Sequence, residues 1–313
     1  IDFTTPRLTD DLDVFSRPVT YVGVYVEGAE RHEVKAFITE EWAAVSGVRD
    51  VVWTTNMIAG VRDVSVGRTG RYAFSSRGDS LRADWGRVHL VGPFVEGNMT
   101  RFLLAYDNVK SVRFFGEDLV DWWARDGKSF DDMFFEAFGD ASRLEAECCK
   151  FDEQFREDME KIGGVKYADI AELAWRQSFA ACKFVAGPGK EPFLMSAENG
   201  SGGMIGTTDV FYPQFPHLLM SSVTLAKASL SPTCIYATSS NWPYAYAPHD
   251  LGLFPVAEGQ FFPTAAKSLF RENRRSSAQS SLFWNSSPCP QVSGKTKRFL
   301  RKRSRIRKLS AIC

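Results

Sequence analysis

Two short segments hold most of the side chains that could do chemistry. The first, residues 196–213, contains four glycines together with the carboxylates of Glu198 and Asp209. Glycine lets a backbone bend closely around a ligand, and two carboxylates can serve as an acid and a base. The second, residues 248–252, contains the pair His249-Asp250. An imidazole beside a carboxylate can hold or transfer a proton near neutral pH, so the two segments together predict a site for proton-transfer chemistry.

Aromatic side chains precede the His-Asp pair in the loop 241–248. Rings in such a position can stack against a polar ligand, including a sugar. They are Trp242, Tyr244 and Tyr246. Each polar residue also has an ordinary structural interpretation, since Glu198 could cap a helix, Asp209 could bond turn amides and His249 could be a satisfied structural histidine.

The common motifs for nucleophiles and metals are missing from the sequence. It contains no Gly-x-Ser-x-Gly, no His-Glu-x-x-His, no phosphate-binding loop and no EF-hand loop. Its six cysteines form no Cys-x-x-Cys pair, and no histidine lies at ligand spacing from them. Cys182 falls in an apolar helical pattern, so we interpret it as a core residue rather than a nucleophile. We therefore expect no metal site and no cofactor.

The formal net charge of zero hides two parts of opposite charge. Residues 261–313 hold 13 Lys+Arg and one acidic residue, which leaves 25 Lys+Arg against 37 Asp+Glu in residues 1–260. The acidic body argues against a nucleic-acid-binding protein. The Ser-rich basic tail cannot bury enough apolar surface to offset its ordering entropy, so we expect it to be disordered. One interpretation is a nuclear-localisation or polyanion-binding arm, which would bind nucleic acid non-specifically. The other, which we favour, is an aberrant C terminus.

The sequence offers little for a membrane. No apolar run reaches the ~18 residues that a spanning helix requires, so we expect no membrane association. The chain opens at Ile1 without a basic and apolar leader, and we interpret it as a processed or incomplete chain. Three Asn-x-Ser/Thr sequons, which weakly favour secretion, begin at Asn98, Asn199 and Asn285.

The N-terminal part of the chain predicts β structure. Residues 19–26 are rich in β-branched and aromatic side chains, and residues 32–39 alternate apolar and polar positions. Further short runs, separated by glycine-containing turns, follow at 50–55, 70–75, 80–84, 87–92 and 100–106. Many short strands with no helical period between them are typical of an antiparallel β-sandwich, which we place at residues 1–112.

A helical period begins after this region. Ser129 is placed to cap a long helix that is broken near Gly139 and ends at Gly163-Gly164. A second helix is predicted over residues 167–185, antiparallel to the first, and a third over 215–229. A helical domain therefore occupies residues 113–260, and the basic tail covers 261–313.

Several ordered motifs resemble the glutaminase A family. In the helical part they are Tyr167-Ala-Asp-Ile-Ala-Glu-Leu-Ala-Trp-Arg-Gln-Ser-Phe-Ala-Ala-Cys-Lys183, Ser196-Ala-Glu-Asn-Gly200, Ile205-Gly-Thr-Thr-Asp-Val-Phe-Tyr-Pro213, and His249-Asp-Leu-Gly-Leu-Phe-Pro255 with Gly259-Gln260. In the β part they are Phe15-Ser-Arg-Pro-Val-Thr-Tyr21 and Asp84-Trp-Gly86, and at the junction Tyr106-Asp-Asn-Val, Trp122-Trp123 and Cys149-Lys-Phe-Asp152. The resemblance covers residue 1 to about residue 260.

The resemblance implies a β-sandwich followed by a six-hairpin (α/α)6 toroid. It also implies a secreted or periplasmic hydrolase that releases ammonia from L-glutamine. A closed toroid of twelve helices needs on the order of 250 residues. We therefore expect residues 113–260 to form an incomplete toroid and the chain to be truncated. The glycine loop also departs from the family, with Ala197 where a lysine is usual and Gly200 where an aromatic or small residue is usual.

Hydrolysis of an amide needs a base for water, an acid for the leaving ammonia and donors for the oxyanion. We assign Glu198, Asp209 and Asp250 to catalysis. Substrate contacts are assigned to Arg176, Asn199, Tyr212, His249 and Trp242, where Arg176 could instead form an ion pair with Glu172, four residues earlier on one helix. The substrate is a small molecule, and the oligomeric state is not indicated.

Two alternatives to a glutaminase stay open at this point. The first is a glycoside hydrolase that uses paired carboxylates on the same toroid, ~6.5–9.5 Å apart if it inverts. The second is a protein without catalytic activity, a binding or remnant form, which the incomplete ring and the basic tail would explain.

Overall fold

The structure is a computed structural model of the chain and describes residues 1–28, 33–43, 50–58, 60–68, 74–78, 85–198 and 200–262. The predicted site residue Asn199, most of the predicted strands at 70–75 and 80–84, and the tail from residue 263 onward lie outside these ranges. In the described residues, no helix is long and apolar enough to cross a membrane.

The N-terminal part forms a six-stranded sheet in which every neighbouring pair of strands is antiparallel. Its order is β1-β2-β6-β5-β4-β3, with β1 at Asp2–Thr4, β2 at Val19–Tyr25, β3 at Val51–Ile58, β4 at Val61–Arg68, β5 at Arg87–Glu96 and β6 at Met99–Asp107. A short helix, α1 (Leu12–Ser16), connects β1 to β2. The predicted strand at 32–39 is wrong in its described part, because residues 33–39 form no strand.

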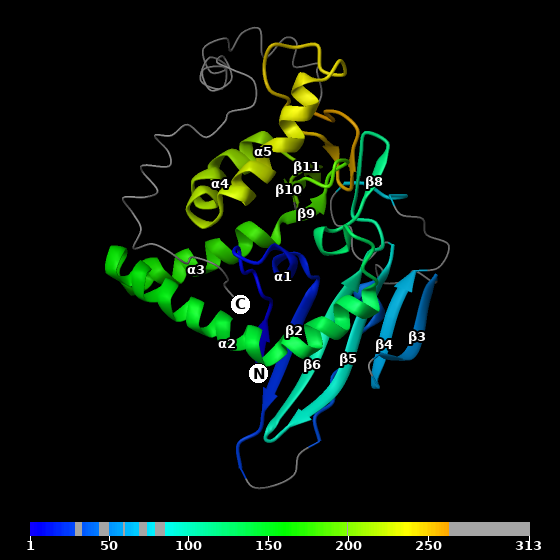
Figure 1. Ribbon diagram of the computed structural model, residues 1–313, viewed down its shortest axis with the longest axis vertical. Coiled ribbons are helices and arrows are strands. Elements are labelled where there is room, and N and C mark those ends of the chain that lie inside the picture. The colour runs from blue at the N-terminus through cyan, green and yellow to red at the C-terminus, as the bar shows by residue number, and fades with distance from the viewer. Residues whose placement is uncertain are drawn as a thin grey trace.

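Helix α2 (Phe130–Gly163) covers one face of this sheet (Figure 1). The Ser129 side chain accepts a hydrogen bond from the Asp132 backbone N–H at 3.1 Å, as the predicted cap requires. Across the interface, the Tyr21 hydroxyl donates to the Ala137 carbonyl at 2.7 Å, and the Phe94 and Phe138 rings stack at 4.2 Å between centroids. The helix is continuous through Gly139, so the predicted break there is wrong.

The opposite face of the sheet carries a smaller apolar cluster. Ala43, Val66 and Val88 are buried there, and Ala43 directly follows the 3-10 helix η1 (Glu40–Trp42). The predicted order of the fold, an antiparallel β region followed by helices, is confirmed. In the described residues, helix α2 is the layer that packs on the face of the sheet with the larger apolar core.

Helix α3 (Val165–Ala180) returns antiparallel to α2 after a turn at Gly164, whose φ is +77°. It ends five residues earlier than predicted, and residues 182–186 form strand β9 (Cys182–Ala186) paired with β10 (Pro192–Ser196). Cys182 is therefore in a strand, not in a helix. The run Cys-Lys-Phe-Val-Ala followed by a Gly-Pro-Gly turn suits a hairpin, and pairing with the apolar β10 decides the outcome.

Two helices replace the single one predicted at 215–229. Helix α4 (Thr208–Ser221) and helix α5 (Val223–Thr238) lie side by side, and α5 packs on β10 (Figure 1). They separate at Ser222, whose extended backbone breaks the helical path and whose hydroxyl accepts from the Leu225 N–H at 3.4 Å. The hydroxyl thus caps α5.

A second sheet links segments far apart in the sequence. Its order is β11-β12-β13-β7-β8, with β11 at Met204–Ile205, β12 at Gly252–Leu253, β13 at Val256–Ala257, β7 at Val112–Phe114 and β8 at Glu117–Leu119. Strands β13 and β7 pair in parallel, which anchors the chain near residue 256 beside residue 113. The 3-10 helix η2 (Trp122–Ala124) then leads toward α2. The boundaries at residues 112 and 260 stay predictions.

Candidate functional site

The segment 248–252 lies between two others that hold it by backbone hydrogen bonds. On one side, Thr208 at the start of α4 donates its N–H to the His249 carbonyl and its hydroxyl to the Pro248 carbonyl, both at 2.7 Å. The Leu251 N–H donates to the Ile205 carbonyl at 2.9 Å. On the other side, the Gly259 N–H donates to the Leu251 carbonyl at 3.0 Å. His249 is thereby placed where the segments 196–209, 248–252 and 259–262 meet.

The carboxylate of Asp250 is the buried centre of this arrangement. Its side chain is 0% exposed. It accepts hydrogen bonds from the backbone N–H groups of Gly252 at 2.9 Å, Phe261 at 2.7 Å and Phe262 at 3.1 Å, and it lies 3.1 Å from His249 Nδ1. A buried carboxylate is tolerable when several donors satisfy it, and four do so here. Asp250 is closed to solvent, so it can act on the reaction only through His249, and its assignment to catalysis stays a prediction.

Gly252 makes this arrangement possible. Its φ is +138°, and a Cβ atom there would lie 2.3 Å from the Val256 carbonyl oxygen. Only glycine fits a backbone that bends this way and approaches another strand so closely.

The His249 imidazole lies among three acidic side chains. Its Nδ1 faces Asp250, and its Nε2 lies 4.0 Å from Asp209 Oδ2. The hydrogen bond with Asp250 raises the pKa of His249 above its ordinary value; partial burial opposes this shift, and the charges of Asp209, Asp250 and Glu198 add to it. The side chain is 26% exposed, so this ring remains open to solvent while Asp250 is closed. An imidazolium with one outward nitrogen can give a proton to a leaving group.

Glu198 comes from the glycine-rich loop after β10. Its backbone N–H donates to the Met204 carbonyl at 2.9 Å, which closes the loop, and its Oε2 accepts from the Ser201 hydroxyl at 3.0 Å. The carboxylate is half-buried and in electrostatic range of His249. In the described residues, it forms no ion pair with Lys or Arg. Such a carboxylate stays available as an acceptor of a proton from water.

The remaining predicted residues differ in how far they are exposed to solvent. Tyr212 is 55% exposed and lies one turn after Asp209 on the same face of α4. Trp242 is 6% exposed, packs edge-on against Tyr244 and Tyr246, and donates its indole N–H to the Tyr246 carbonyl at 2.5 Å. It lies in the core of this loop, and its contact with a substrate stays a prediction.

Arg176 is exposed on α3, and among the described residues no hydrogen bond or ion pair joins it to the cluster around His249. Its contact with a substrate carboxylate stays a prediction. The alternative ion pair with Glu172 is wrong, because Glu172 accepts from Arg156 on α2 at 2.8 Å. Cys182 behaves as a core thiol, since burial raises its pKa to about 11.

Two residues of the site were missed in the sequence. Gln260 Oε1 accepts from the His249 N–H at 2.8 Å, and the Phe262 ring stacks on the His249 ring at 4.5 Å. Gln260 belongs to the short Gly-Gln motif after the His-Asp segment, so its place was visible there. No periodicity or motif pointed to Phe262.

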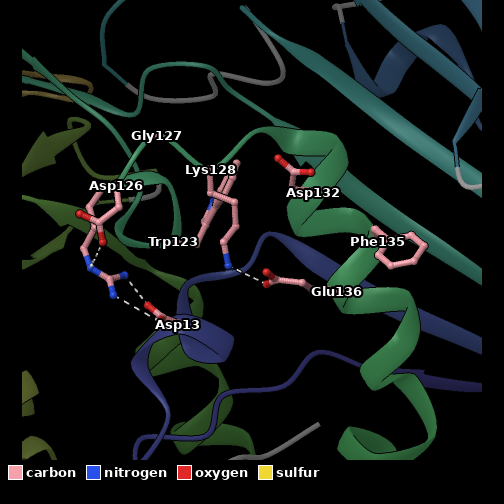
Figure 2. Close-up of a pocket in the computed structure, with 9 residues that line it drawn as sticks. Asp13, Trp123, Asp126, Gly127, Lys128, Asp132, Phe135 and Glu136 are labelled. Atoms are coloured by element: carbon pink, nitrogen blue, oxygen red, sulfur yellow. Dashed lines mark hydrogen bonds and ion pairs between the residues drawn. The ribbon is translucent and has the colours of Figure 1, made fainter.

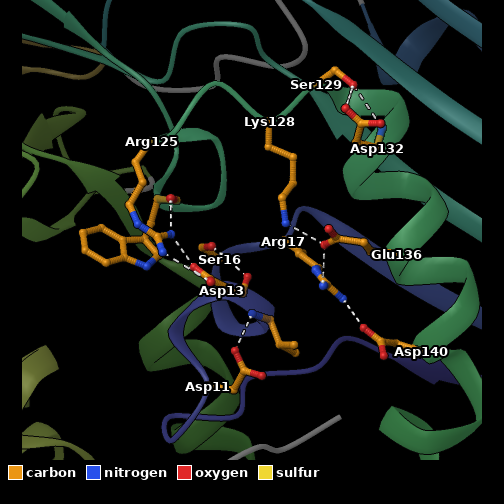
Figure 3. Close-up of polar contacts among 12 residues, drawn as sticks. Asp11, Asp13, Ser16, Arg17, Arg125, Lys128, Ser129, Asp132, Glu136 and Asp140 are labelled. Carbon is orange, nitrogen blue, oxygen red and sulfur yellow. Dashed lines mark hydrogen bonds and ion pairs between the residues drawn. The ribbon is translucent and has the colours of Figure 1, made fainter.

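A pocket of about 510 Å³ lies elsewhere, where α1 and η2 meet the start of α2 (Figure 2). Most of its ionic side chains already have an ion-pair partner, whereas Asp132 accepts from the Ser129 hydroxyl. Arg125 binds Asp13, and Lys128 binds Glu136 at 2.6 Å; Arg17, outside the pocket lining, joins Glu136 and Asp140 at 3.0 and 2.7 Å (Figure 3). This closed network stabilises the junction of α1 and α2. The candidate site is therefore the His249 cluster and not this pocket.

No group of three or more His, Cys, Asp or Glu side chains in the described residues is arranged to hold a metal ion. The polar chemistry available at the cluster is proton transfer between an imidazole and carboxylates.

The fold is an antiparallel β region followed by helical hairpins, and the helical part carries the His249 cluster. These two features define the class of protein. Residues 164–269 match the Glutaminase A six helical-hairpin domain, and residues 1–98 match a domain of unknown function, DUF5127. These two matches support a glutaminase A-like family for the chain.

Two curated relatives point to the same family. The chain is 32% identical over 109 residues to "Glutaminase A" of Aspergillus oryzae (strain ATCC 42149 / RIB 40), which covers 34% of this chain and 16% of that protein. It is 31% identical over 111 residues to a probable glutaminase of Arthroderma benhamiae (strain ATCC MYA-4681 / CBS 112371), covering 35% and 13%. The matched segments thus span less than a fifth of either relative. No solved structure matches the chain significantly.

Proposed function

We propose that this chain carries the acid–base cluster of a hydrolase that releases ammonia from L-glutamine. One observation supports it above the others: the His249 imidazole stands between Asp250 at 3.1 Å and Asp209 at 4.0 Å, with Glu198 in electrostatic range. The sequence relatives that bear a glutaminase name agree with this chemistry.

The roles follow from the surroundings of each group. Glu198 accepts a proton from water, and the oxygen of that water attacks the side-chain amide carbon of the substrate. As the tetrahedral intermediate collapses, the carbon–nitrogen bond breaks and His249 Nε2–H gives its proton to the departing nitrogen, which leaves as ammonia. The raised pKa of His249 keeps the imidazolium populated for this step.

Asp209 and Asp250 act on His249 in different ways. Asp250 holds Nδ1–H inward, so Nε2 faces outward. Asp209, whose side chain is 74% exposed, favours the charged imidazolium and can contact the substrate ammonium group. Tyr212, one turn along α4, is a polar contact for the substrate.

The experiment measures ammonia released from L-glutamine by the purified chain and by Glu198→Gln and His249→Gln. Each variant should lose on the order of 10²-fold in kcat, the usual contribution of a general acid or base. Asp10→Asn changes an exposed carboxylate on the β side and serves as the matched control. Unchanged rates in both variants reject the assignment, and activity on aryl-glycosides in place of glutamine indicates a glycoside hydrolase instead.

We also propose that the protein is secreted. Asn98, which begins an Asn-Met-Thr sequon, is exposed in the turn between β5 and β6. Passage through a eukaryotic secretory pathway should attach a glycan there. A glycosidase-sensitive mass that Asn98→Gln reduces supports secretion; absence of the protein from the medium counts against it.

A further inference from the structure

We propose that Phe262 is a positioning residue for His249, held in place by Asp250 and Gln260. This inference rests on the proposed function, since the consequence for the reaction depends on His249 handling the proton.

The first observation is the ring contact itself. The Phe262 and His249 ring centroids lie 4.5 Å apart with an interplanar angle of 29°, a stacked arrangement. Stacking covers one face of the imidazole and restricts its rotation about the Cα–Cβ and Cβ–Cγ bonds. An aromatic face also attracts an imidazolium cation.

The second observation is how the backbone under Phe262 is held. The two carboxylate oxygens of Asp250 accept from the N–H groups of Phe261 at 2.7 Å and Phe262 at 3.1 Å. The same carboxylate contacts His249 Nδ1 at 3.1 Å. One buried group therefore fixes both partners of the stack relative to each other.

The Gln260 side chain links His249 to Phe262 by two hydrogen bonds. Its Oε1 accepts from the His249 N–H at 2.8 Å, and its Nε2 donates to the Phe262 carbonyl at 3.1 Å. The Gln260 backbone N–H in turn donates to the Tyr236 hydroxyl on α5 at 3.3 Å. His249 is consequently held through its backbone, its Nδ1 and one ring face, while Nε2 lies 4.0 Å from the largely exposed Asp209 carboxylate.

A proton donor needs this restraint. A displacement of about 1 Å at a reacting group can cost about 10²-fold in rate, even when the group itself is unchanged. Loss of the stacking ring leaves the Asp250 hydrogen bond in place, so we expect a smaller effect, roughly tenfold in kcat.

The test compares Phe262→Ala with Phe261→Ala and Phe262→Tyr. Phe261 is the matched control: it is the neighbouring phenylalanine, it is 57% exposed, and its backbone N–H still bonds Asp250 after substitution. Phe262→Tyr keeps a stacking ring. Two readouts are used, the steady-state kcat and KM for ammonia release and the NMR signal of the His249 Cε1 proton, which a ring above it shifts upfield.

Phe262→Ala should lower kcat about tenfold with little change in KM, and should move the His249 signal downfield. Phe261→Ala and Phe262→Tyr should resemble the wild type in both readouts. The inference is overturned if the His249 signal stays in place in Phe262→Ala, or if Phe261→Ala gives the same loss. If the wild type releases no ammonia, the proposed function fails, and the NMR comparison still decides whether Phe262 positions His249.

Discussion

His249 Nδ1 lies 3.1 Å from a carboxylate oxygen of Asp250 that has no exposure to solvent. The imidazole is partly exposed to solvent and the carboxylate is fully buried. The charge state of His249 therefore depends on a neighbour that the solvent does not reach. Four measurable consequences follow from this pair and from three other contacts in the fold.

Asp250→Asn should lower the pKa of His249. Asparagine keeps an oxygen that can accept from Nδ1–H but removes the negative charge that favours the imidazolium. Because the folded-state pKa of His249 is raised, its contribution to stability is complete below the unfolded value near 6.5 and is lost as pH rises through the folded value.

An NMR titration of His249 in wild type and Asp250→Asn measures the change directly. Asp209→Asn is the comparison, with a smaller fall expected because Asp209 is more distant and 74% exposed. Equal pKa values in wild type and Asp250→Asn would show that the charge of Asp250 does not stabilise the imidazolium.

Gly252→Ala should destabilise the protein more than alanine at another positive-φ glycine. Gly252 and Gly28 have φ values of +138° and +113°, but only at Gly252 would a Cβ meet another atom, the Val256 carbonyl oxygen at 2.3 Å. We expect roughly 1–2 kcal/mol for Gly28→Ala from backbone strain and about 2 kcal/mol more for Gly252→Ala. Urea denaturation measures both, and equal losses would contradict the predicted close approach.

His217 should make the protein less stable as pH falls below neutrality. Its ring packs against Trp175 at 4.3 Å and Phe179 at 4.9 Å, and burial lowers its pKa to about 4. Between pH 6.5 and about 4 the unfolded state binds a proton that the folded state does not, so stability falls as pH falls through that window.

His217→Phe should remove this dependence while it keeps an aromatic ring against Trp175. The free energies of unfolding at pH 7 and pH 5 are compared in both proteins, and the wild type should lose on the order of 1–2 kcal/mol more than the variant. An identical pH dependence would mean that His217 titrates normally.

Glu145→Gln should weaken the contact between the sheet and α2. Arg101 on β6 is 2% exposed and donates to Glu145 at 3.0 and 2.7 Å. Removing the charge of one partner leaves a buried guanidinium less compensated, although Glu96 still contacts it at 3.2 Å. We expect a loss of about 2–4 kcal/mol.

The matched control lies two residues further along the same helix. Glu147 pairs with Arg143, but both side chains are nearly half exposed, at 46% and 49%. Glu147→Gln should cost under about 0.5 kcal/mol, because solvent screens the pair. Comparable losses from Glu145→Gln and Glu147→Gln in urea denaturation would contradict the burial of Arg101.

Local pattern was sufficient for much of the fold. The cap at Ser129, the turn at Gly163-Gly164 and the strands at 19–25 and 87–92 are visible in residue types and spacing, because each depends on neighbours within a few positions. The acidic residues and the histidine of the cluster could also be picked out from their residue types alone. Helix α3 was predicted too long and the region 208–238 was not divided, because the ends of these elements depend on pairing and packing with distant segments.

The sequence by itself determined the order of elements and the kinds of side chain that could do chemistry. The tertiary structure decided which of them meet. It closed Asp250 inside four donors, buried Trp242, and set Phe262 on the ring of His249, thirteen residues earlier. The physical reason is that a side chain's type is a local property, whereas its exposure and partners depend on contacts such as the parallel pairing of β13 with β7, which no local period encodes.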